Sequence, residues 1–201
     1  MDIEIRKLTP ELAEDYACFF DKTPHDDDVY EHKCYCVCWA SADHSAGTDF
    51  SSREKRRELA IRYINSGIIQ GYLAYLDGQI VGWCNANTKS DCLKCIGWLR
   101  NMTFVNEMES SSDIKVKSIY CFTIAPDMKR KGIATKLLER VCEDAANEGY
   151  NFIEVYPNKH SDNISKGFMG PLELYKRNGF VICQDVKNQY NDIFVMRKSL
   201  K

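Results

Sequence analysis

The chain has 201 residues, and its 27 basic and 29 acidic side chains leave a formal net charge of −2. Such a near balance disfavours proteins that coat nucleic acids, because these need a strongly basic surface. No apolar run approaches the roughly 20 residues that cross a bilayer, and residues 1–15 lack the apolar segment of a secretory signal. We therefore expect a cytoplasmic protein whose partners include no nucleic acid and no membrane.

The first elements are a strand and a helix. Apolar and polar residues alternate over residues 2–8, as they do in a half-buried strand. Thr9 and Pro10 are typical of the start of a helix, which we expect to end near Phe20. An acidic loop is expected over residues 21–33.

A second helix and a hairpin follow. Ser51 and Glu54 have the spacing of a capping box, which predicts a helix that ends at Gly67. Asp77-Gly78 is a strong signal for a two-residue hairpin turn. The strands on either side of this turn are expected over residues 71–77 and 79–87.

The rest of the chain mixes both element types. Residues 88–113 are expected to be irregular, apart from a short amphipathic helix within 92–102. An apolar stripe between Lys131 and Glu148 predicts a helix stopped by Gly149, and Pro171 and Gly179 bound another helix over 171–178. Strands are expected over residues 114–125, 151–156, 180–186 and 192–198. This order predicts one domain over residues 1–201, of the α+β (mixed α/β) class.

The segment from Phe122 to Thr135 passes from a predicted strand through a tight turn into a helix. The first amides of a helix have no partners within it, and the helix dipole adds positive charge there. Gly132 and Ala134 leave the backbone accessible, and the cations of residues 129–131 surround it. The segment has neither a Walker ending nor a G-x-G-x-x-G fingerprint, but it predicts a cradle for phosphate groups.

This segment resembles a motif of the GNAT superfamily of N-acetyltransferases. Lys129-Arg-Lys-Gly132-Ile-Ala134 is similar to the family pattern Q/R-x-x-G-x-G/A, with Lys129 in place of the usual Gln or Arg. Tyr175-Lys-Arg-Asn-Gly179-Phe180 is similar to the family's Tyr-x-x-x-Gly-Phe. The likeness extends over residues 71–201, whereas the first 70 residues match only in element order.

Shorter fragments resemble an uncharacterised bacterial subgroup of that superfamily. They are KCYCVCW at 33–39, VGWC at 81–84, CF at 121–122 and EVYP at 154–157. This narrower likeness supplies no acceptor substrate.

The resemblance implies a central mixed, mostly antiparallel sheet of about seven strands, flanked by helices and with splayed central strands. It implies acetyl-CoA as co-substrate, no required metal, and direct attack by a primary amine of a small molecule or peptide within a ternary complex. A monomer or a homodimer is expected. The implied coenzyme contacts are Phe122, Thr123, Ile124, Lys129, Arg130, Lys131, Gly132, Ile133, Ala134 and Thr135.

The resemblance also suggests catalytic residues. Tyr175 matches the family's tyrosine and is expected to protonate the leaving thiolate, although it could simply pack against the sheet. Glu154 is the candidate general base, with a solvent-facing charge as the alternative, and His160 is a weaker candidate. The predicted strand 114–125 lacks the carboxylate that serves as base in some family members. A non-catalytic CoA-binding or cysteine- or metal-sensing regulatory protein on the same fold is therefore the alternative function.

The cysteines allow three interpretations, namely a structural metal site, reactive or redox thiols, and buried or incidental thiols. In an extended segment, Cys34-x-Cys36-x-Cys38 would project its sulfurs to one side, and Cys92-x-x-Cys95 has the spacing of metal ligands, with His32 and His44 available. Cysteine is also a small apolar residue in a reducing compartment. We favour buried or incidental thiols over a structural metal or a reactive cysteine.

Two further groups of residues could take part in acceptor binding, although an ordinary structural role is favoured for both. The acidic run Asp26–Asp28 with Glu31 could steer a cationic amine, but solvated loops more often carry such runs. Trp39, Trp83 and Trp98 could wall an acceptor pocket, although core packing is the default for tryptophan.

Overall fold

The computed structural model describes residues 2–24, 29–40, 49–102, 105, 111, 113–159, 164–187 and 192–201. Its centre is a seven-stranded sheet with strand order β1-β2-β3-β4-β5-β7-β6. Only β4 and β5 pair in parallel, so the expected mixed, mostly antiparallel sheet is confirmed. The strands are β1 (Glu4–Lys7), β2 (Gly71–Leu76), β3 (Gln79–Thr88), β4 (Val116–Ile124), β5 (Phe152–Val155), β6 (Val181–Lys187) and β7 (Asp192–Ser199).

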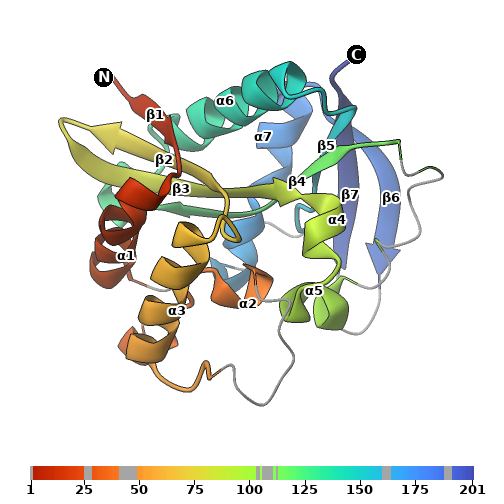
Figure 1. Cartoon of the computed structure of the whole chain (residues 1–201). Coiled ribbons are helices and arrows are strands. Elements are labelled where there is room, and N and C mark those ends of the chain that lie inside the picture. Colours follow the sequence, from red (N-terminus) through yellow and green to blue (C-terminus); the bar gives the residue numbers. More distant parts are fainter. Residues whose placement is uncertain are drawn as a thin grey trace.

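Helices cover both faces of this sheet (Figure 1). The α-helices are α1 (Ala13–Lys22), α2 (Val37–Ala40), α3 (Arg53–Asn65), α4 (Lys89–Cys92), α5 (Ile96–Asn101), α6 (Ile133–Asn147) and α7 (Leu172–Arg177). Short 3₁₀ helices are η1 (Pro10–Leu12), η2 (Tyr30–His32), η4 (Pro126–Met128) and η5 (Ile164–Met169). No helix in the described ranges is both long and apolar enough to cross a membrane.

Two apolar clusters form the core, one on each face of the sheet. Successive strand residues point to opposite faces, so Leu73 joins one cluster and Tyr72 the other. The first cluster joins the sheet to α1, α2, α3 and α5, and contains the fully buried Trp83 and Trp98. The second joins it to α6 and α7, and α6 contributes its expected apolar stripe.

The predicted hairpin is confirmed. Leu76 pairs with Gln79 across a two-residue turn, in which Asp77 and Gly78 have φ angles of 49° and 77°. Both values lie in the left-handed region, which a turn of this type requires at its two central positions. Aspartate tolerates this region better than most residues, and glycine has no side chain to oppose it.

Several predictions near helix starts were wrong in detail. The N-cap of α3 is Ser52, whose hydroxyl accepts a hydrogen bond from the Lys55 amide at 3.2 Å, so Ser51 and Glu54 form no capping box. Pro10 opens a 3₁₀ turn before α1 rather than the α-helix itself. Residues 88–113 are less irregular than expected, because α4 follows β3 directly and α5 lies within the predicted amphipathic stretch.

The extended conformation assumed for Cys34-x-Cys36-x-Cys38 was also wrong. Tyr35 and Cys36 have φ angles of 47° and 54°, so the chain turns sharply there and enters α2 at Val37. The Tyr16 hydroxyl donates to the Tyr35 carbonyl oxygen at 2.9 Å and fixes this turn against α1. The three sulfurs therefore do not share one side of a strand.

The two central strands separate part of the way along. β4 and β5 pair only over residues 116–119 and 152–155. Beyond that point the chain after β5 stays with β7, since the Phe194 amide donates to the Pro157 carbonyl oxygen and Asn158 bridges to Ile193. The end of β4 stays with β3. This separation is the splay that the resemblance implied.

A bulge lies at the point of separation. Asn85 of β3 pairs with Cys121 and the next residue, Ala86, pairs with Ile119, so Tyr120 is an extra residue in β4. A bulge bends its strand and increases the local twist. It therefore directs residues 121–124 away from β5 and opens the sheet at its middle.

Candidate active site

The open end of β4 borders a cavity of about 1230 Å³. One part of its wall is the end of β4 with the turn and first residues of α6, and another is formed by η5 and α7. The remaining wall comes from the end of α1, the loop before α2, and Trp39 of α2. A cavity of this size is large enough for a cofactor-sized ligand.

The cavity includes nearly all the residues expected to hold a coenzyme. They are Phe122, Thr123, Ile124, Lys129, Arg130, Gly132, Ile133, Ala134 and Thr135. Lys131 is the exception, because it is not among the lining residues and its Nζ lies 3.5 Å from the Met128 sulfur. Sequence reasoning did not select Arg177 and Asn178 of the α7 end, which also line the cavity.

The turn before α6 is shaped as an anion site. Arg130 and Gly132 have φ angles of 63° and 81°, and these left-handed residues curve the backbone between the strand and the helix. Within the described part of the chain, the amides of residues 130–135 form no hydrogen bond, and the first helical bond runs from the Lys136 amide to Gly132. Unpaired amides at a helix start attract negative charge, and the helix dipole adds to this.

Gly132 is the N-cap of α6. Apart from its two chain neighbours, no described residue has a heavy atom within 4 Å of the position that a Cβ would occupy there. The space above the backbone is therefore open. A diphosphate group can approach the amides closely, so the residues present fit the pyrophosphate of coenzyme A.

Tyr175 lies beside the cavity but is fully buried. Its hydroxyl donates to the Met169 carbonyl oxygen at 2.6 Å, and burial raises the pKa of this phenol well above its ordinary value. A Cβ added at Gly170, a lining residue, would lie 2.5 Å from the hydroxyl oxygen. To reach a ligand, the hydroxyl would have to leave Met169, so its role as general acid stays a prediction.

Glu154 is held in a buried ionic cluster. Its carboxylate accepts a hydrogen bond from the Tyr156 hydroxyl at 2.7 Å and pairs with Lys89 and Arg197 at 3.0 and 2.5 Å. It is not among the residues that line the cavity. Both carboxylate oxygens already have partners within the protein. Its role as general base stays a prediction that this geometry does not support, and His160 lies outside the described residues.

The cysteines, all of which lie in the described ranges, form no disulfide, and most are buried or partly buried. The Sγ atoms of Cys36 and Cys121 lie 3.7 Å apart, and Cys121 with Cys34 lines the cavity. The hydrogen bond to Cys121 and burial raise the pKa of the Cys36 thiol. Among the described residues, no group of three or more potential ligands could hold a metal ion.

The remaining candidates divide between the cavity and the core. Of the three tryptophans only Trp39 lines the cavity, whereas Trp83 and Trp98 pack in the core. The acidic run Asp26–Asp28 and His44 lie outside the described residues. Glu31 is described, and its carbonyl oxygen accepts a hydrogen bond from Arg56.

Comparisons with solved structures show the same fold. A polyamine N-acetyltransferase of Drosophila melanogaster, which forms N-acetylagmatine, has a TM-score of 0.60 at 11% identity, over 98% of this chain and 100% of that one. An aminoglycoside acetyltransferase in complex with coenzyme A has a TM-score of 0.58 at 15% identity, over 98% and 95% of the two chains. The PaiA N-acetyltransferase of Thermoplasma acidophilum, also with coenzyme A, gives 0.53 at 17% identity and 99% of each chain.

Sequence comparison supplies the family. No curated protein matches the chain. The family model described as acetyltransferase (GNAT) family matches residues 10–180, which is most of the chain. It includes the sheet from β2 to β5, the turn before α6, and α7. The chain therefore belongs to the acetyltransferase (GNAT) family.

Proposed function

We propose that this protein transfers an acetyl group from acetyl-CoA to a primary amine of a small molecule or peptide. The observation that carries the proposal is the row of unpaired amides over residues 130–135, which faces a cavity continuous with the open end of β4. Family membership and the coenzyme A complexes of solved neighbours support acetyl-CoA as the co-substrate.

Each part of the cavity has a role in this proposal. The amides of residues 130–135, with Lys129 and Arg130, bind the diphosphate. The backbone of residues 122–124, which pairs with β3 on one side only, binds the pantetheine arm as an added strand would. When bound, acetyl-CoA supplies an activated thioester. The protein holds it next to the bulge at Tyr120, where an amine can approach from the side of Trp39 and Cys121.

Acetyl transfer also requires that a proton leave the acceptor amine. A protonated amine is not a nucleophile, so its proton must leave before or during attack. Among the described lining residues the only carboxylate is that of Glu173, which pairs with Lys176 at 3.0 Å on the surface. We therefore propose that water in the cavity carries the proton away.

A screen with acetyl-CoA and pooled amines tests the function. The pools contain aminoglycosides, polyamines, amino acids and peptides, and acetylated product and free CoA are measured by mass spectrometry. We expect amine-dependent release of CoA by the wild type and little release by Gly132→Asp. Saturable acetyl-CoA binding without product in any pool would contradict the proposal and favour the non-catalytic CoA-binding alternative.

A further inference from the structure

One buried lysine in the cavity wall forms no ion pair with any residue that the structure describes. Lys33 lines the cavity and is only 4% exposed. Its ammonium donates to the backbone carbonyl oxygen of Asp21 and lies 4.9 Å from the centre of the Tyr30 ring. In the described ranges of the chain it forms no ion pair. Lysine is almost never this buried unless it is paired, because an ammonium loses its hydration.

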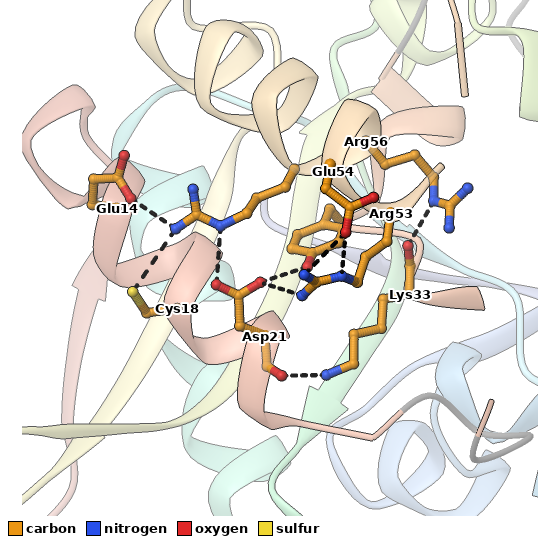
Figure 2. A network of polar contacts seen from close by, with 9 residues as sticks. Glu14, Cys18, Asp21, Lys33, Arg53, Glu54 and Arg56 are labelled. Atoms are coloured by element: carbon orange, nitrogen blue, oxygen red, sulfur yellow. Dashed lines mark hydrogen bonds and ion pairs between the residues drawn. The ribbon is translucent and has the colours of Figure 1, made fainter. Parts of the chain in front are cut away.

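The described carboxylate that acts on Lys33, that of Asp21, is already shared by other groups. Asp21 accepts hydrogen bonds from the Tyr35 hydroxyl at 2.6 Å and from Arg57 at 2.9 Å, and its carboxylate also lies 3.4 Å from Arg53. Figure 2 shows Asp21 at the centre of this network, with Lys33 reaching only its carbonyl oxygen. Desolvation lowers the pKa of Lys33, although Asp21 partly opposes this effect.

The other acidic side chains of the network face solvent. Glu14 pairs with Arg57 and Glu54 with Arg53, and their side chains are 68% and 60% exposed. Neither has a described contact with Lys33. Within the described ranges, Lys33 therefore forms no ion pair with a carboxylate, a feature that it shares with Arg56 of the same network.

The position of Lys33 is fixed by its neighbours in the loop before α2. Arg56 of α3 donates from Nε to the Lys33 carbonyl oxygen at 2.8 Å (Figure 2). Its guanidinium also donates to the carbonyl oxygens of Glu31 and Phe50. Tyr35, two residues further on, is held by Asp21. A cation held in place before a ligand arrives binds an anion without a large loss of side-chain freedom.

The surroundings of Lys33 indicate what such a ligand carries. Phe20, Trp39 and Cys121 give this part of the cavity an apolar wall. The cations assigned to the diphosphate, Lys129 and Arg130, lie on the turn before α6, a different part of the wall. The part formed by α1 and the loop before α2 is therefore suited to an apolar group next to a negative charge.

We propose that Lys33 selects acceptor amines that carry a carboxylate and an apolar side chain, as free apolar amino acids do. This inference rests on the proposed function, since it names the class of amine that the cavity accepts. Lys33 has a second, structural role, because Asp21 is in the last turn of α1 and a cation there complements the helix dipole. The test must separate selection of the acceptor from support of the helix.

Matched acceptors that differ in one group provide this separation. L-phenylalanine and L-leucine carry a carboxylate, whereas their primary amides have the same shape and no negative charge. The variants are Lys33→Met, Lys33→Arg, which keeps the cation, and Lys22→Met, which removes an exposed cation from the same end of α1. For each acceptor, the kcat/KM of the variant is divided by the kcat/KM of the wild type. Differences in basicity between the amino acids and the amides therefore cancel.

We expect Lys33→Met to lower kcat/KM for the amino acids at least about tenfold and for the amides less than about threefold. Lys33→Arg should retain most of the wild-type kcat/KM for the amino acids. Lys22→Met should leave kcat/KM unchanged for both the amino acids and the amides. A structural role alone would lower the melting temperature and reduce both acceptor classes equally. Equal losses, or a loss in the form of a higher KM for acetyl-CoA, would overturn the proposal.

Binding measurements keep this inference separate from the proposed function. In the presence of CoA, calorimetry with L-phenylalanine and its amide reports the anion site whether or not acetyl transfer occurs. The inference is supported if the wild type binds L-phenylalanine more tightly than its amide and Lys33→Met does not. This result supports the inference even if no amine is acetylated. If the protein acetylates amines without a carboxylate as well as it acetylates their carboxylate analogues, the proposed function stands and the role of Lys33 is refuted.

Discussion

Replacing Gly132 by aspartate places a negative charge at the centre of the proposed diphosphate site. Gly132 is the N-cap of α6 with φ of 81°, and no protein atom lies near the position of an added Cβ. The new side chain therefore meets no steric clash in the protein itself. Left-handed backbone costs an ordinary residue about 1–2 kcal/mol, and less for Asp or Asn. An acidic N-cap recovers about 0.3–1 kcal/mol from the helix dipole, so the variant should fold.

The effect on binding is larger than the effect on folding. Two unit charges about 6 Å apart repel by about 3 kcal/mol at an effective dielectric constant of about 20, and salt reduces this value. We therefore expect Gly132→Asp to bind acetyl-CoA at least about tenfold more weakly, which corresponds to about 1.4 kcal/mol. Gly132→Asn is the matched control, because it has the same shape and tolerance of left-handed backbone without the charge.

Calorimetric titration with acetyl-CoA at low and high salt measures both variants. We expect Gly132→Asn to bind more tightly than Gly132→Asp, with a difference that narrows as salt screens the repulsion. Melting curves of the two proteins check that both are folded. Equal affinity of the two variants at low salt would refute the placement of the diphosphate at this turn.

The other predictions concern groups next to the cavity. Glu154→Gln leaves two cations without a buried counter-ion, so we expect a loss of about 3 kcal/mol in the free energy of unfolding, seen by urea denaturation. An unchanged stability combined with a large loss of kcat would instead identify Glu154 as the base. Tyr175→Phe removes the hydrogen bond to Met169, and we expect about 1 kcal/mol less stability with kcat within about threefold of wild type. A loss of kcat beyond about tenfold with an altered pH profile would assign Tyr175 as the acid. Burial alone would raise the pKa of Asp21, but its hydrogen bonds and guanidinium partners lower it, so its contribution is present above the ordinary aspartate pKa and is lost as the pH falls below it. The stability difference between wild type and Asp21→Asn should therefore shrink between about pH 5 and pH 3, and a difference that is constant over this range would contradict the network.

Features set by short-range rules could be predicted from the sequence. The hairpin at Asp77-Gly78 and the N-cap at Gly132 depend on residues that tolerate left-handed backbone, and both lie where expected. The left-handed Arg130 is not a residue of this kind, and its conformation was not predicted. The choice between Ser51 and Ser52 as N-cap was wrong because either serine has the required hydroxyl. The Asp49 carboxylate, which accepts from the Ser51 amide, belongs to the turn that places Ser52 at the cap.

Features set by contacts between distant segments could not be predicted. The sharp turn at Tyr35 and Cys36 depends on bonds to Tyr16 and Asp21 of α1, which no local pattern indicates. The burial of Lys33 depends on Arg56, 23 residues away in the chain. A lysine in an acidic loop is typical of a solvated side chain, so no sequence signal distinguished it.

The separation of β4 from β5 has a consequence for the protein without its coenzyme. Residues 121–124 then present backbone donors and acceptors in the middle of the sheet, a position where proteins normally leave none exposed. Such a gap invites any extended chain to fill it, including a strand from another molecule. A coenzyme bound at the proposed site would fill this gap and close it to such strands.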